Sequence, residues 1–158
     1  MIIKEYQLNE VIKKNSYPPF LLFFGPNEGL IRDDIMKICS SFRENLETEE
    51  ITIYGKTLDE NYSLIDEEIR SFSMFSEKKI IYLENLKEKH LQYFENQKIE
   101  NNKILVIIKS DNLSKSSKIR SFFEKHKRYA AVPCYEDDMK STMNLLSRFQ
   151  SENKIKFN

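Results

Sequence analysis

The sequence has few of the side chains that most often bind metals. Among its 158 residues there are two cysteines and two histidines. Cys39 and Cys134 lie far apart and without the spacing of a metal site, so we interpret them as buried thiols in a reducing compartment. His90 and His126 have no cysteine, histidine or aspartate neighbours of the kind that a metal site needs, and we expect both to be solvated helix residues. The sequence therefore predicts neither a metal site nor a bound cofactor.

The chain also lacks an excess of either charge and any long apolar run. Lysine and arginine together number 25, as do aspartate and glutamate, so the formal net charge is zero. A protein that coats nucleic acid would instead be basic overall. No apolar run approaches the roughly 20 residues of a membrane span, and the first residues do not show the basic and then apolar pattern of a signal peptide. We therefore expect a cytoplasmic protein that does not contact a membrane.

What the chain does contain is an alternation of strand-like and helix-like patterns. Hydrophobic residues make up 40% of it, enough for a core at this length. The runs FLLFF and ILVII are apolar throughout, which is typical of central strands in parallel sheets. Strands are predicted at 20–24, 51–54, 80–83, 104–108 and 129–134, and helices near 8–12, 31–42, 58–72, 86–97 and 119–123. The sequence thus predicts a three-layer α/β domain with a mostly parallel five-stranded sheet flanked by helices.

A last helix is predicted beyond the fifth strand. Its expected buried face consists of Met139, Met143, Leu146 and Phe149. No further strand follows with which this helix would pack. We therefore divide the chain into a first domain, residues 1–136, and the start of a second small helical domain, residues 137–158, which looks truncated.

The turn after the first strand has the position of a phosphate-binding loop but not its residues. The full motif, G-x-x-x-x-G-K-[ST], binds phosphate through backbone N–H groups, a lysine and a hydroxyl group. Here Gly25 begins the pattern, but Gly29 comes one residue early, and Ile31 and Arg32 replace the lysine and the hydroxyl residue. Glu28 would also repel a phosphate. We interpret this segment as a tight strand-to-helix turn that binds no nucleotide.

Carboxylates follow two of the predicted strands. Glu84 ends the third strand and Asp111 follows the fourth, so the two side chains could meet at the same sheet edge. We interpret them as caps or solvated groups, and no triad or paired-carboxylate arrangement predicts a catalytic site. The alternative is a divergent P-loop ATPase or nucleotide kinase that uses the Gly25 turn and Glu84. A receiver-like signalling domain ranks last, because Glu84 and Asn85 do not supply the aspartate that such a fold carries after its third strand.

Residues 109–128 are locally basic. Lys115, Lys118 and Arg120 are the possible contacts to a phosphate backbone in this segment. A solvated helix face would have the same composition, so both interpretations stay open.

The segment SFSMFSEKKIIYLEN, residues 71–85, combines apolar side chains in a turn with the third strand. Phe72 continues the helical spacing before it and is expected in the core. Met74 and Phe75 come after the helix and before two lysines, in a segment too short to turn both inward. An adjacent methionine and aromatic ring make a good anchor for the pocket of another protein.

Four segments of the chain resemble, in the same order, the delta subunit of the clamp loader of bacterial DNA polymerase III, particularly its alphaproteobacterial members. FLLFFGPNEGLIR resembles the family's "hhhhGxxEGLxR" opening, and SFSMFSEKKIIYLEN its "S-L-F-x-x-(R/K)-(R/K)-hhhh" segment. ILVIIKSDNLSKSSKIRSFFE and AAVPCYEDD are similar to the family's third and fourth conserved stretches. Together the four segments span nearly the whole chain.

The resemblance implies a first domain with an AAA+ fold of the P-loop NTPase type that has no working nucleotide site. It implies that the protein binds the sliding clamp (beta) and helps to open it, with a Leu-Phe pair that enters an apolar pocket of the clamp. Carried over, that pair is Met74 and Phe75, and methionine replaces leucine at similar volume. It further implies contacts with the gamma/tau and delta prime subunits in the full-length protein, indirect contact with DNA, and a non-catalytic role in a DNA-directed DNA polymerase (nucleotidyltransferase) holoenzyme.

Overall fold

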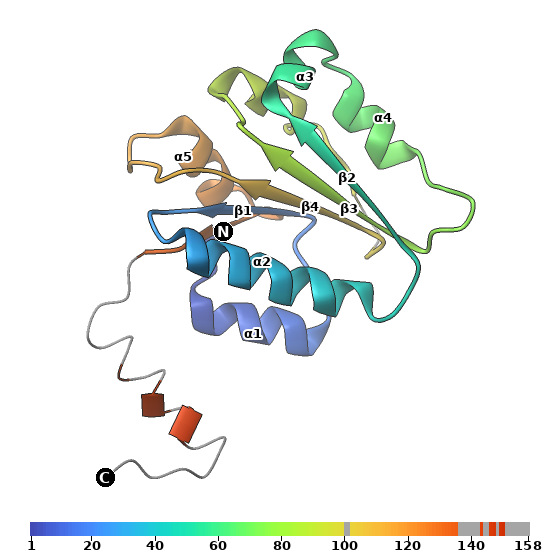
Figure 1. Cartoon of the computed structure of the whole chain (residues 1–158). Coiled ribbons are helices and arrows are strands. Elements are labelled where there is room, and N and C mark those ends of the chain that lie inside the picture. Colours follow the sequence, from blue (N-terminus) through green and yellow to red (C-terminus); the bar gives the residue numbers. More distant parts are fainter. Residues whose placement is uncertain (100–101, 136–142, 144–145, 148, 151–158) are drawn as a thin grey trace.

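A single five-stranded parallel sheet organises the computed structural model of the chain (Figure 1). The structure describes residues 1–99, 102–135, 143, 146–147 and 149–150. The strands are β1 (Phe20–Phe24), β2 (Thr48–Tyr54), β3 (Lys78–Glu84), β4 (Ile104–Lys109) and β5 (Ala130–Pro133), and their order in the sheet is β2-β3-β4-β1-β5. The predicted α/β class is confirmed, and β5 lies at one edge of the sheet.

Helices cover both faces of the sheet (Figure 1). On one face lie α1 (Glu5–Lys14) and α2 (Glu28–Arg43). On the other lie α3 (Gly55–Glu60), α4 (Leu64–Arg70), the 3-10 helix η1 (Glu88–Tyr93) and α5 (Lys118–Lys125). None of the helices described is long and apolar enough to cross a membrane.

The interior strand β1 contributes side chains to two hydrophobic cores, one on each face of the sheet. Successive side chains of a strand point to opposite faces of the sheet. Phe20, Leu22 and Phe24 therefore pack beneath η1 and α5, whereas Leu21 and Phe23 pack beneath α1 and α2. All five side chains are fully buried, as the unbroken apolar run predicts.

Two predicted helices are shorter in the structure than the apolar spacing suggests. The helix expected over 58–72 is two short helices, α3 and α4, because the Asn61 side chain accepts hydrogen bonds from the backbone N–H and hydroxyl of Ser63 at 3.2 and 2.8 Å. Local bonds of this kind compete with helix formation. Phe72 consequently lies beyond the end of α4 and is 37% exposed, so its predicted place in the core is wrong. The helix expected over 86–97 is the single short η1.

The two histidines are also less exposed than expected. His90 is fully buried: its Nε2 donates to Asp59 Oδ1 at 2.6 Å, and its Nδ1 accepts from the backbone N–H of Lys87 at 3.0 Å. His126 is half-buried and stacks on Tyr129 with ring centres 3.6 Å apart. Hydrogen bonds from Lys89 and His90 lower the pKa of Asp59. The expectation of solvated histidines is therefore wrong.

The predicted last helix falls mainly outside the described residues. Met143, Leu146 and Phe149 are described and exposed, whereas the sequence pattern placed them on a buried face. The division into residues 1–136 and 137–158 stays a prediction.

Candidate functional site

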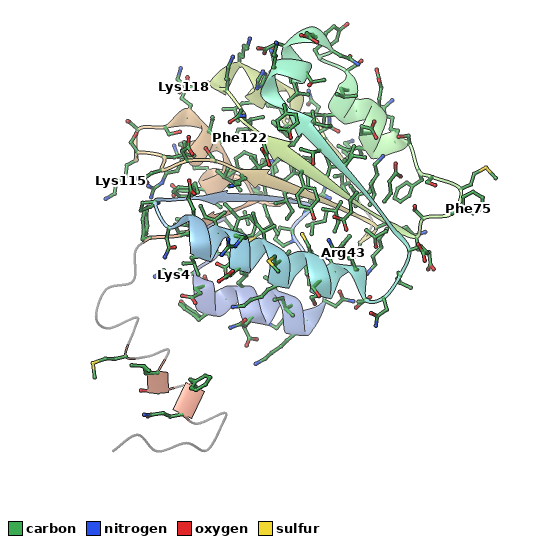
Figure 2. The ribbon with its side chains drawn as sticks, viewed as in Figure 1. Lys4, Arg43, Phe75, Lys115, Lys118 and Phe122 are labelled. Carbon is green, nitrogen blue, oxygen red and sulfur yellow. The ribbon has the colours of Figure 1, made fainter. Side chains whose placement is uncertain are left out.

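The loop between α4 and β3, residues 71–77, carries the most exposed large apolar side chains among the residues that the structure describes. Met74 is 94% exposed and Phe75 is 85% exposed; we call these two residues the tip. Figure 2 shows Phe75 pointing away from the body of the domain, at the edge of the sheet where β3 begins. Neither side chain packs in the core of the domain.

The backbone beneath the tip is held by internal hydrogen bonds. Ser73 closes the turn, because its carbonyl accepts from Ser76 N–H at 3.3 Å and its hydroxyl from Phe75 N–H at 3.4 Å. On the far side of the loop, Glu77 N–H donates to the carbonyl of Glu47 at 2.8 Å, which ties the loop to the start of β2. The apolar side chains are thus exposed on a backbone whose polar groups have partners.

The two lysines that were expected just before the third strand belong to β3 and are buried. Lys78 and Lys79 point to opposite faces of the sheet, since they are consecutive in a strand. The ammonium of Lys78 donates to the carbonyl of Phe42 and to Glu44 at 3.0 Å, and it lies 4.8 Å from the centre of the Phe42 ring. This lysine therefore caps the carboxyl end of α2. Lys79 lies on the other face, directly under the loop.

The turn after β1 keeps the shape of a phosphate-binding loop, but its groups bond within the protein. Gly25 has a φ of +138°, and a Cβ at this position would lie 2.0 Å from the carbonyl oxygen of Cys134. The backbone N–H of Asn27 donates to the same carbonyl at 3.3 Å, and the Asn27 side chain accepts from Leu30 N–H at 3.0 Å, which caps α2. Arg32 is exposed and lies 3.8 Å from Asp33. Gly29 lies in the first turn of α2. That this turn binds no nucleotide stays a prediction.

A buried carboxyl group lies on α2 close to this turn. Asp34 is almost fully buried; its Oδ2 lies 3.9 Å from Cys134 Sγ, and its Oδ1 has no hydrogen-bond partner within the part of the chain that the structure describes. Burial raises the pKa of Asp34 to about 6 and that of the Cys134 thiol to about 12. Sequence reasoning missed Asp34, although its spacing from Ile31 and Ile38 places it on the buried face of the helix.

The two predicted strand-end carboxylates line one cavity of about 290 Å³ at the carboxyl edge of the sheet. Its lining residues are Glu84, Asn85, Leu86, Lys109, Ser110 and Asp111. Glu84 and Asp111 therefore line the same cavity, and Lys109 lines it with them. No group of three or more candidate metal ligands occurs among the described residues.

The three basic residues that were predicted to contact a phosphate backbone differ in their exposure and in their bonds within the protein. Lys115 and Lys118 are exposed on the same side of the domain, and Lys118 lies 3.3 Å from Glu88 (Figure 2). Arg120 instead bonds to Glu124 at 2.7 Å and to the Tyr135 hydroxyl at 3.0 Å. The guanidinium of Arg120 is thus bonded within the protein, whereas the two lysines are exposed to solvent. Contact with DNA stays a prediction for all three.

Comparisons with known proteins agree with this architecture. The parallel sheet in this order, with helices on both faces, forms an α/β domain whose strand-to-helix turn lacks the lysine and the hydroxyl residue of a phosphate-binding loop. The family model described as "DNA polymerase III, delta subunit" matches residues 21–134, and the chain belongs to that family.

One solved structure, the DNA clamp loader delta protein of Bacillus subtilis, shares the fold with a TM-score of 0.60 and 13% sequence identity. The match covers 94% of this chain and 47% of the other, so the chain spans about half the length of that protein. No curated protein sequence matches the chain.

Proposed function

We propose that this domain binds a sliding clamp through Met74 and Phe75 and helps to open it, so that a clamp loader can place the clamp on DNA. The observation that carries the proposal is the exposure of both side chains on a loop whose backbone is internally bonded. Burying one large apolar side chain in a partner's pocket contributes about 1.5–3 kcal/mol. The pair therefore suits a hot spot at the centre of a protein interface.

Opening follows from differential binding. If the pocket accepts the tip better when the clamp interface is strained or open, the contact energy shifts the clamp towards that state. This role needs no nucleotide site in the domain, consistent with the internal bonds of the Gly25 turn. The gamma/tau and delta prime subunits would then join the full-length protein, and DNA would be contacted only indirectly.

The test is clamp binding by Met74→Ala/Phe75→Ala, measured by surface plasmon resonance on immobilised beta clamp. We expect a loss of affinity of about 100-fold or more, because both anchors are removed. A matched control is Met36→Ala/Tyr62→Ala, which removes two exposed apolar side chains elsewhere on the surface and should bind as the wild type does. Equal affinity of the tip variant and the wild type would refute the assignment.

A further inference from the structure

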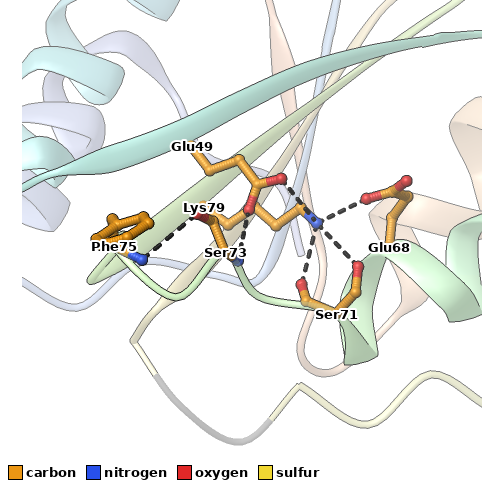
Figure 3. Close-up of polar contacts among 6 residues, drawn as sticks. All are labelled: Glu49, Glu68, Ser71, Ser73, Phe75 and Lys79. Atoms are coloured by element: carbon orange, nitrogen blue, oxygen red, sulfur yellow. Dashed lines mark hydrogen bonds and ion pairs between the residues drawn. The ribbon is translucent and has the colours of Figure 1, made fainter.

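Lys79 occupies an unusual position for a lysine, directly beneath the exposed loop. Its side chain is 0% exposed. The ammonium lies 2.6 Å from Glu68 Oε2 and 3.0 Å from the carbonyl oxygen of Ser71, with the Ser71 hydroxyl at 3.3 Å (Figure 3). A carboxylate oxygen of Glu49 lies 3.7 Å away. All the donors of this buried cation are thereby directed at oxygen atoms.

The partners of Lys79 come from three separate parts of the fold. Glu68 belongs to α4, Ser71 begins the loop and Glu49 belongs to β2. Glu49 also accepts the backbone N–H of Ser73 at 3.2 Å, directly before the tip (Figure 3). A buried charge without partners is strongly unfavourable. If the start of the loop moved away from β2 and β3, the ammonium would lose both Ser71 oxygens and Glu49 would lose the Ser73 N–H.

We propose that Lys79 is a positioning residue for clamp binding. Its ammonium fixes residues 71–73 against the sheet, so that Met74 and Phe75 are already in the binding conformation before the clamp arrives. Fixing a loop in its bound conformation lowers the entropy cost of association. This role rests on the proposed function of the tip, and it adds a residue that touches no part of the clamp.

The test is Lys79→Met in the full chain. Methionine fills a similar volume with apolar atoms, and the carboxylates of Glu49 and Glu68, which are 28% and 27% exposed, can turn to water. We expect faster hydrogen exchange of the loop amides in residues 71–77. If about one tenth of the loops keep the binding conformation, the association rate falls by about 10-fold while the dissociation rate is unchanged.

The matched control is Lys78→Met. Lys78 is also a buried lysine of β3, but its ammonium caps α2 and does not touch the loop. This variant should lower the melting temperature and leave both the exchange of residues 71–77 and the association rate unchanged. If Lys78→Met lowers only the melting temperature, a general loss of stability does not account for a slower association rate of Lys79→Met.

Each outcome decides the proposal. Wild-type loop exchange and a wild-type association rate in Lys79→Met would show that Lys79 does not position the tip. If Lys79→Met does not fold, Glu68→Gln makes the same test, since it removes the charge of the nearest partner but keeps an acceptor. The proposed function has its own readout: should Met74→Ala/Phe75→Ala bind normally while Lys79→Met loosens the loop, clamp binding by the tip is wrong although Lys79 still orders the loop.

Discussion

Two turns of this domain lie at opposite ends of the strands and differ in which side chains they expose to solvent. The turn at Gly25 follows the carboxyl end of β1, where open parallel sheets usually bind their ligands. The loop at residues 71–77 precedes the amino end of β3. In both turns backbone N–H groups bond within the protein. At the first turn the backbone of Gly25 is buried against the carbonyl of Cys134 and no large apolar side chain is exposed, whereas at the second the tip faces solvent.

In the turn at Gly25, groups at the position where such sheets usually bind a ligand are bonded within the fold. The carbonyl of Cys134 accepts the Asn27 N–H and lies against Gly25, so the residue that follows β5 occupies the space in front of this turn. Function is then to be sought where side chains remain exposed on an ordered backbone. Three variants test this contrast, taken from the largest expected effect to the smallest.

The first variant tests how tightly the turn after β1 is closed. Gly25→Ala places a methyl group 2.0 Å from the Cys134 carbonyl oxygen at a φ that L-residues rarely adopt. We expect a loss of about 3 kcal/mol or more in the free energy of unfolding, measured with urea. Gly29→Ala is the control, because its Cβ would only contact Asn27 at 3.6 Å, and alanine favours the helix by up to about 1 kcal/mol. Similar effects of the two substitutions would mean that the turn is not closed by the residue that follows β5.

The second variant tests the buried carboxyl group on α2. Burial raises the pKa of Asp34 from 3.8 to about 6, so ionisation is easier in the unfolded chain. The stability that the protonated group contributes is complete below pH 4 and is lost as the pH rises through about 6. At pH 8, the free energy of unfolding of Asp34→Asn should therefore be about 3 kcal/mol higher than that of the wild type, since the shift is about two pKa units and each corresponds to about 1.4 kcal/mol.

This gain should shrink as the pH falls from 6 to 4, which urea titrations at a series of pH values can follow. A difference between Asp34→Asn and the wild type that is the same at every pH would show that the charge of the carboxylate is not its cause.

The third variant tests the exposed side of the comparison. Met74→Ala/Phe75→Ala should change the free energy of unfolding by less than about 0.5 kcal/mol, because neither side chain packs in the domain. The same urea measurement checks this. A loss of several kcal/mol would mean that the tip contributes to the core, and its effect on binding would then have to be reinterpreted.

Much of the fold was predictable because the apolar pattern is strong. FLLFF and ILVII had the length and composition of central strands, and they are β1 and most of β4. The helices on the second face were predicted less well, since hydrophobic spacing continued through Asn61, where a side chain bonds to the backbone. Phe72 was misplaced for the same reason, because the helix that was expected to turn it inward ends before it.

Only some residues of the site were predictable, and there is a physical reason why the others were missed. Met74 and Phe75 were identified because two large apolar groups follow a helix and precede a strand in a short segment. The buried polar groups were missed. Asp34 had a signal in its spacing from Ile31 and Ile38, but whether Lys79 or His90 is buried depends on partners elsewhere in the fold. Local composition carries no signal for such pairs.

The strand order has a consequence for how the chain folds. The interior strand β1 pairs with β4 and β5, which come last in chain order among the five strands of this sheet. At a translation rate of 5–20 residues per second, β1 waits on the order of ten seconds for its first partner. During that interval FLLFF is an apolar segment without charge or proline, which is the kind of sequence that aggregates. The most buried strand of the finished domain is thus the one that most needs protection while the chain is being made.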